Sequence, residues 1–127
     1  MDEQQTEKKI LLVEDEDFIR DIYKRQLTMG GFTVDAFGNG QEGLAALSQN
    51  TYSLVLLDIM LPGMTGLDIL KRIKSDERTK NITVILLTNL GQESVINEGL
   101  ALGAKEHIMK ASITPDQLVE KVKQLLG

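Results

Sequence analysis

The chain has 127 residues, of which 42% are hydrophobic and 26% charged, a composition typical of globular proteins. The absence of cysteine excludes disulfides and thiolate metal sites, and the single histidine, His107, disfavours a histidine-based zinc site. The net charge of -5 disfavours direct nucleic-acid binding, and no apolar run approaches the roughly 20 residues that cross a bilayer. The polar N-terminus does not have the pattern of a signal or transit peptide, so we expect a cytoplasmic location without membrane contact.

Short apolar runs alternate with amphipathic stretches along the chain, and the length favours one domain over 1–127 with a flexible tail at 1–8. The predicted elements, in chain order, are a strand at 9–13, a helix at 17–27, a strand at 32–37, a helix at 39–47, a strand at 53–58, a helix at 65–74, a strand at 82–88, a helix at 92–102, a strand at 104–109 and a helix at 114–126. The last helix has a clear start, with Thr114 as the N-cap, Pro115 at the first helical position and Gln117 completing a capping box.

Five strands that alternate with five helices predict an α/β fold of (βα)5 type, with a parallel sheet covered by helices on both faces. Right-handed crossovers leave few topologies, and among them we expect the doubly wound, flavodoxin-like strand order 2-1-3-4-5. This order places a ligand-binding crevice at the carboxyl ends of the first and third strands.

Polar residues lie where four of the predicted strands end. Glu14 and Asp15 follow the first strand, Asp58 ends the third, Thr88 the fourth and Lys110 the fifth. Any one of them alone is more simply a helix cap or a solvated surface residue. Together they should converge at one edge of the parallel sheet, because the carboxyl ends of its strands all lie there.

The chemistry of this set points to phosphoryl transfer. Three carboxylates repel one another unless a cation neutralises them, and oxygen ligands without thiol or imidazole suit Mg²⁺. A lysine and a threonine hydroxyl opposite the metal would hold the oxygens of a dianionic group. A carboxylate that attacks phosphorus forms an aspartyl-phosphate.

Three segments then resemble the bacterial response-regulator receiver domains. Residues 10–16 (ILLVEDE) are similar to the first strand and acidic cluster of that family, 56–66 (LLDIMLPGMTG) to its phosphoacceptor loop, and 103–110 (GAKEHIMK) to its fifth-strand signature. The resemblance covers about 8–126, nearly the whole chain. It implies a signalling receiver that catalyses only its own phosphorylation and slow dephosphorylation.

The resemblance also implies a role for each residue of the metal site. Asp58 would accept a phosphoryl group from a sensor histidine kinase or a phosphotransfer protein. Asp15 and Asp58 would ligate Mg²⁺ directly, with the Met60 carbonyl as a third protein ligand. Glu14 would act through metal-bound water.

A conformational switch is implied by the same resemblance. Thr88 and Lys110 would bind phosphoryl oxygens, and His107, at the family's usually aromatic switch position, would turn inward as Thr88 moves. An ordinary solvated edge-strand residue is an equally good interpretation of His107. The face formed by the fourth helix, fifth strand and last helix would contact a downstream effector, and a phosphorylation-dependent homodimer is a further option.

Two departures from the family pattern concern the residues after Lys110 and Thr88. Ala111 stands where the family usually has proline, so we predict a trans Lys110–Ala111 peptide. Asn89 is larger than the usual residue and narrows access to Asp58.

The sequence fits three alternative functions less well. A flavin protein would need a phosphate loop where this chain is acidic. A haloacid-dehalogenase-type phosphatase would need an aspartate where Met60 stands. A non-phosphorylated pseudo-receiver that serves as an interaction scaffold stays open, although the complete set of site residues disfavours it.

Overall fold

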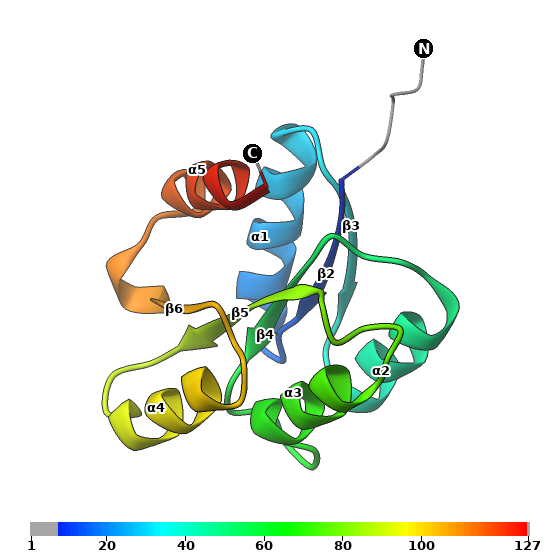
Figure 1. Cartoon of the computed structure of the whole chain (residues 1–127). Coiled ribbons are helices and arrows are strands. Elements are labelled where there is room, and N and C mark those ends of the chain that lie inside the picture. Colours follow the sequence, from blue (N-terminus) through cyan, green and yellow to red (C-terminus); the bar gives the residue numbers. More distant parts are fainter. Residues whose placement is uncertain (1–7, 127) are drawn as a thin grey trace.

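The computed structural model describes residues 8–126 and forms a parallel sheet with helices on both faces (Figure 1). Its elements are β2 (Lys9–Val13), α1 (Asp17–Met29), β3 (Thr33–Phe37), α2 (Gly40–Gln49), β4 (Leu54–Asp58), α3 (Gly66–Ser75), β5 (Thr83–Thr88), α4 (Glu93–Ala101), β6 (Glu106–Met109), the 3-10 turn η1 (Lys110–Ser112) and α5 (Pro115–Leu126). The predicted tail at 1–8 lies, apart from Lys8, outside the described residues. None of the helices within 8–126 has the length and apolar character needed to span a membrane.

The five-stranded sheet has the order β3-β2-β4-β5-β6, and every neighbouring pair is parallel. Counted along the chain this is the order 2-1-3-4-5, so the predicted topology is confirmed. The register pairs Val13 with Leu57, Asp58 with Leu87, and Thr88 with Met109. The carboxyl ends of the three inner strands and β6 therefore lie side by side.

The sheet separates two hydrophobic cores. α1 and α5 cover one face, and α2, α3 and α4 cover the other (Figure 1). Every residue of β4 is buried, as expected for a central strand with helices on both faces. Burying one Leu or Val side chain contributes about 1.5–3 kcal/mol, so the central strands form a rigid base beneath their carboxyl ends.

Side-chain caps start the helices that flank the site. The Thr65 hydroxyl accepts from the backbone N–H of Asp68, and the Asp68 carboxylate accepts from the Thr65 N–H, which completes a capping box at α3. Thr114 and Gln117 exchange the same pair of bonds at α5, and this predicted cap is confirmed. The Asn39 side chain likewise caps α2.

The last strand is shorter than the predicted 104–109. Ala104 donates its N–H to the carbonyl of Gly99, at the end of α4, instead of joining the sheet. Gly103 has φ of 115°, a left-handed conformation that glycine adopts without strain and that commonly ends a helix. After Met109 the chain turns at once into η1, and residues 8–126 contain no cis peptide, so the Lys110–Ala111 bond is trans as predicted.

Candidate functional site

Three carboxylates meet at the carboxyl edge of the sheet. One oxygen from each of Glu14, Asp15 and Asp58 lies within 4.8 Å of the other two. Glu14 and Asp58 are 0% and 2% exposed, whereas Asp15 faces solvent. The sequence prediction that these residues converge is confirmed by this geometry. The cluster is therefore open to solvent on the side of Asp15 and enclosed by protein on the side of Glu14 and Asp58.

Lys110 lies between the two buried carboxylates. Its Nζ is 3.0 Å from Glu14 Oε1 and 3.0 Å from Asp58 Oδ2, and 3.5 Å from the more exposed Glu16 Oε2. Burial disfavours the charged ammonium, but the hydrogen bonds to Glu14 and Asp58 outweigh burial and raise the pKa of Lys110. The lysine is therefore charged at neutral pH.

The charge of the Glu14 carboxyl depends on its surroundings. Burial raises the pKa of its carboxyl to about 7, against hydrogen bonds from the Glu16 N–H and from Lys110 that lower it. The negative charge of Asp58 acts with burial and raises the pKa further. At neutral pH the Glu14 carboxyl is thus close to its point of half-protonation.

Asp58 and Thr88 are held in defined orientations. Asp58 Oδ1 accepts from the Met60 N–H at 2.9 Å, so both carboxylate oxygens of Asp58 have partners. The buried Thr88 hydroxyl donates to the Ile108 carbonyl at 3.3 Å, which directs it toward β6. His107, also on β6, is exposed. Exposure is expected both for a switch residue before phosphorylation and for an ordinary edge-strand residue.

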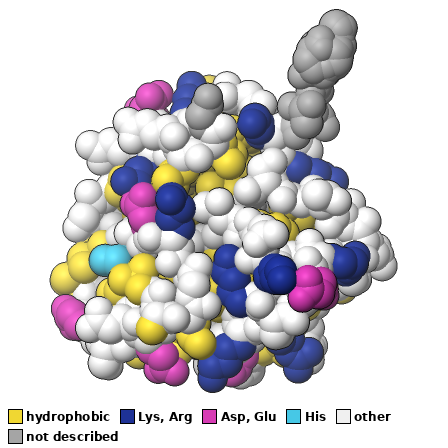
Figure 2. All heavy atoms as spheres, viewed as in Figure 1, with side chains coloured by type: hydrophobic (Ala, Val, Ile, Leu, Met, Phe, Trp, Pro, Cys, Tyr) yellow, Lys and Arg dark blue, Asp and Glu magenta, His cyan; other side chains and the backbone are white. Residues whose placement is uncertain are grey.

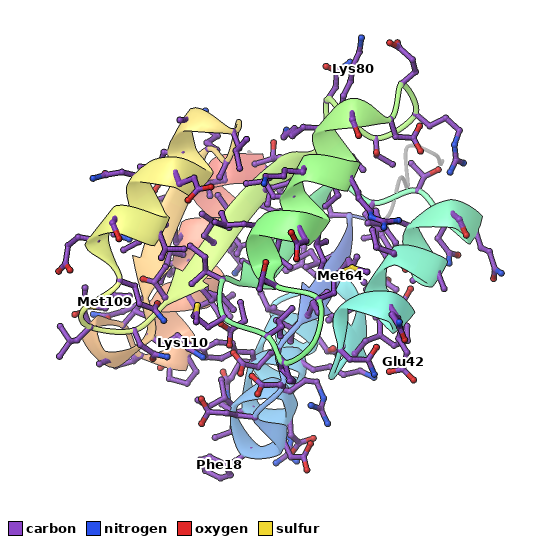
Figure 3. All side chains as sticks on the ribbon, turned by 90° about the horizontal axis from the view of Figure 1, so that it is seen from below. Phe18, Glu42, Met64, Lys80, Met109 and Lys110 are labelled. Atoms are coloured by element: carbon purple, nitrogen blue, oxygen red, sulfur yellow. The ribbon has the colours of Figure 1, made fainter. Side chains whose placement is uncertain are left out.

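Three large apolar side chains in the segments that follow the site residues are exposed. The Met60 and Leu90 side chains are 52% and 74% exposed, and Phe18 is 76% exposed. Viewed from below, Phe18 projects outward at the start of α1, and Lys110 lies beside Met109 (Figure 3). No water-orienting side chain stands at positions 60 or 90, as the sequence indicates.

Comparison with known proteins decides the family. Residues 10–123 match the response regulator receiver domain. The chain belongs to the response regulator receiver domain family. The "Phosphate regulon transcriptional regulatory protein PhoB" of Pseudomonas aeruginosa is 38% identical over 119 residues, which are 94% of this chain and 52% of PhoB. The "Transcriptional regulatory protein SrrA" of Staphylococcus aureus is 36% identical over 93% of this chain and 47% of its own length.

Solved receiver structures agree with this assignment. A CheY-like response regulator receiver domain protein from Methanospirillum hungatei superimposes with a TM-score of 0.87 at 31% identity, over 95% of this chain and 94% of that one. The chemotaxis response regulator CheY4 of Vibrio cholerae gives 0.87 at 26% identity, over 94% and 99%. The receiver chain spans about half the length of the curated relatives it matches. The flavin-protein and phosphatase alternatives are set aside by this membership.

Phosphorylation and Mg²⁺ use are general properties of receiver domains, and the residues of this receiver fit the ion. The donor set consists of carboxylate oxygens, which Mg²⁺ prefers, and it leaves open positions on the exposed Asp15 side for water. The single positive charge of Lys110 neutralises only part of the negative charge of Glu14, Glu16 and Asp58. The cluster therefore has a net negative charge, which attracts a cation.

Sequence reasoning missed two residues of this receiver site. Glu16 reaches Lys110, and the acidic run that contains it was the available signal. Gly66 packs directly beneath Asp58: a Cβ there would overlap the Asp58 carbonyl oxygen and lie 2.7 Å from the Ile59 Cα. The motif Pro62-Gly63-Met64-Thr65-Gly66 showed a loop and a cap but not this contact.

Proposed function

We propose that this receiver domain accepts a phosphoryl group on Asp58, in a Mg²⁺-dependent reaction, from a sensor histidine kinase or a phosphotransfer protein. The observation that supports this proposal is the position of Lys110, which is buried beside a three-carboxylate cluster and lies 3.0 Å from both Glu14 and Asp58. We propose that residues 1–127 form one receiver domain, which acts in the cytoplasm as a signalling receiver whose only catalysis is on itself.

In the transfer step one carboxylate oxygen of Asp58 bonds to phosphorus while the bond between phosphorus and the donor's imidazole nitrogen breaks. The electron pair of that bond stays on the nitrogen, which takes a proton from solvent. Lys110 would then pair its ammonium with a phosphoryl oxygen, and Thr88 would exchange its bond to the Ile108 carbonyl for one to the phosphoryl group.

Four residues would hold the metal. Asp15, Asp58 and the Met60 carbonyl would ligate Mg²⁺ directly, and Glu14 would act through bound water. When bound, the ion supplies positive charge that offsets the charge on the transferring phosphoryl group. The Met60 N–H already bonds Asp58 Oδ1, which fixes the backbone of Met60 next to the acceptor.

The output surface we propose is the face of α4, β6 and α5. A groove of about 600 Å³ lies between β6, η1 and α5, and His107 is part of its lining. Figure 2 shows the single histidine among hydrophobic side chains on this side of the molecule. As Thr88 turns to the phosphoryl group, His107 would turn inward and change the shape of this surface for a downstream effector or a second receiver.

We further propose that the phosphorylated form is long-lived. Hydrolysis needs a water aligned with phosphorus opposite Asp58. The two side chains best placed to orient it, Met60 and Leu90, have no strong hydrogen-bonding group. A partner phosphatase or a bifunctional kinase would then reset the switch.

The test of the proposed function is intact mass before and after incubation with acetyl phosphate and Mg²⁺. We expect a gain of about 80 Da, one phosphoryl group in place of one proton, in the wild type and none in Asp58→Ala. Addition of EDTA should abolish the gain. A wild type that stays unmodified by acetyl phosphate and by a panel of phosphorylated kinases would instead support the pseudo-receiver scaffold.

A further inference from the structure

Arg20 joins three segments beside the acidic site. Its Nη1 donates to the Glu14 carbonyl at 2.9 Å, and its Nη2 pairs with Asp17 Oδ1 at 2.6 Å. Gly38, in the loop between β3 and α2, lies against the same guanidinium: a Cβ at this position would be 3.0 Å from Nη1. Three quarters of the Arg20 side chain is buried, since 25% of it is exposed. This arrangement is unlike that of a solvated helix arginine.

The Glu14 carbonyl that Arg20 holds is part of the peptide unit that leads into Asp15. Glu14 is also held at its N–H by the Phe37 carbonyl at 3.0 Å, and at its carboxylate by the Glu16 N–H and by Lys110. These three bonds fix the position of Glu14. The bond from Arg20 fixes the rotation of the next peptide, and therefore the direction in which the Asp15 side chain leaves the backbone.

We propose that Arg20 is a positioning residue for the metal site. Its guanidinium holds the Glu14–Asp15 peptide so that the Asp15 and Asp58 carboxylates face one common point, and Gly38 leaves the space that this guanidinium occupies. The inference rests on the proposed function, because it takes that point to be the site of Mg²⁺. A fork with two separate donors suits this role, because one bond anchors the side chain to Asp17 and the other sets the peptide.

Charge and positioning make opposite predictions for this residue. Arg20 is a cation near an acidic site, so its charge alone repels Mg²⁺, and its removal would tighten Mg²⁺ binding. Loss of positioning would weaken binding, because partners that orient metal ligands typically contribute about 10–100-fold to metal affinity. The direction of the change therefore separates the two roles.

The experiment measures the Mg²⁺ dissociation constant by isothermal titration calorimetry for wild type, Arg20→Ala, Arg20→Lys and Arg25→Ala. Arg25 is a matched control on the same helix: it pairs with Asp21 at 2.7 Å, and both side chains are exposed. We expect both Arg20 variants to bind Mg²⁺ about tenfold more weakly. Alanine removes both hydrogen bonds, and lysine keeps the charge but cannot donate to the Glu14 carbonyl and to Asp17 in the geometry of the guanidinium. Arg25→Ala should bind as the wild type does.

A second variant, Gly38→Ala, tests the inference even if Arg20→Ala fails to fold. Gly38→Ala should shift the guanidinium by a few tenths of an ångström and weaken Mg²⁺ binding, less than the Arg20 variants do, and the same change should add nothing in an Arg20→Lys background. Wild-type or tighter Mg²⁺ binding in Arg20→Ala or Arg20→Lys would overturn the inference, as would additive effects of Gly38→Ala and Arg20→Lys.

Asp15→Asn separates this inference from the proposed function. If Asp15→Asn binds Mg²⁺ as the wild type does, the metal site itself is wrong. If Asp15→Asn weakens binding while the Arg20 variants do not, the metal site stands and only the role of Arg20 fails.

Discussion

The raised pKa of Glu14 predicts that the contribution of this residue to the stability of the metal-free protein falls as the pH rises toward neutrality. The Glu14 side chain is 0% exposed, and its burial raises the pKa of the carboxyl from 4.5 to about 7. A folded state with the higher pKa binds the proton more tightly than the unfolded chain does, so this group stabilises the fold fully below pH 4.5. That contribution is lost as the pH rises through 7, and by linkage it amounts to about 2–3 kcal/mol between pH 5 and pH 8.

Urea unfolding in EDTA at several pH values between 5 and 8 measures this loss, with Glu14→Gln as the comparison. Glutamine keeps an oxygen that can accept from Lys110 but does not titrate, so the difference between the two proteins cancels the groups that do not interact with Glu14. We expect the free energy of unfolding of Glu14→Gln to rise by about 2–3 kcal/mol relative to wild type over this range. Saturating Mg²⁺ should reduce the difference, because the ion offsets the buried charge. Parallel stability curves in EDTA would refute the reasoning.

Three further predictions concern dephosphorylation, packing and signalling. Met60→Asn should speed the decay of labelled phospho-Asp58 about tenfold or more by supplying an amide that can orient water, and an unchanged decay rate would contradict the slow-hydrolysis proposal. Gly66→Ala should lower the free energy of unfolding in urea by about 3 kcal/mol, because its Cβ would overlap the backbone of Asp58 and Ile59, whereas a near-neutral effect would show that the loop yields easily. Beryllofluoride should shift amide resonances around His107 and along α5 as well as near Asp58; shifts confined to the Asp58 pocket would count against the proposed output face.

The elements that were predicted well depend on local chemistry. The strand at Leu54–Asp58 is a continuous apolar run up to its last residue, and the start of α5 has a capping box formed by Thr114 and Gln117 within four residues. Convergence of Glu14, Asp58 and Lys110 was also predictable, although they are far apart in the chain, because a parallel sheet places all its carboxyl ends on one edge. The predicted strand order was therefore enough to show that these distant residues meet.

The features that were missed depend on contacts that topology does not specify. The sequence shows Lys74 only as a charged residue at the end of the predicted helix 65–74. In the structure its ammonium donates to the Lys80 and Ile82 carbonyls at 3.0 and 2.9 Å, and its methylenes lie beside Gly103. Burial lowers the pKa of this lysine. The shortened last strand has a similar cause, because the turn at Gly103 bonds Ala104 to α4 instead of the sheet. A long side chain or a helix end can form hydrogen bonds with several different backbone groups. Which of these bonds forms depends on the packing of the folded chain.

The shared position of Lys110 suggests how the proposed metal and the phosphoryl group depend on each other. Before transfer its ammonium is divided between Glu14 and Asp58, at 3.0 Å from each, so it lowers the negative charge on the nucleophile. A cation bound at the cluster would take over the charge of Glu14 and free Lys110 to follow the new negative charge on phosphorus. Without that cation, Lys110 could pair with the phosphoryl group only by leaving the buried Glu14 carboxylate with the Glu16 N–H as a partner but no charged one, which is costly. The requirement for Mg²⁺ would therefore arise from the competition for one lysine as well as from the positive charge that the ion would supply near the phosphoryl group.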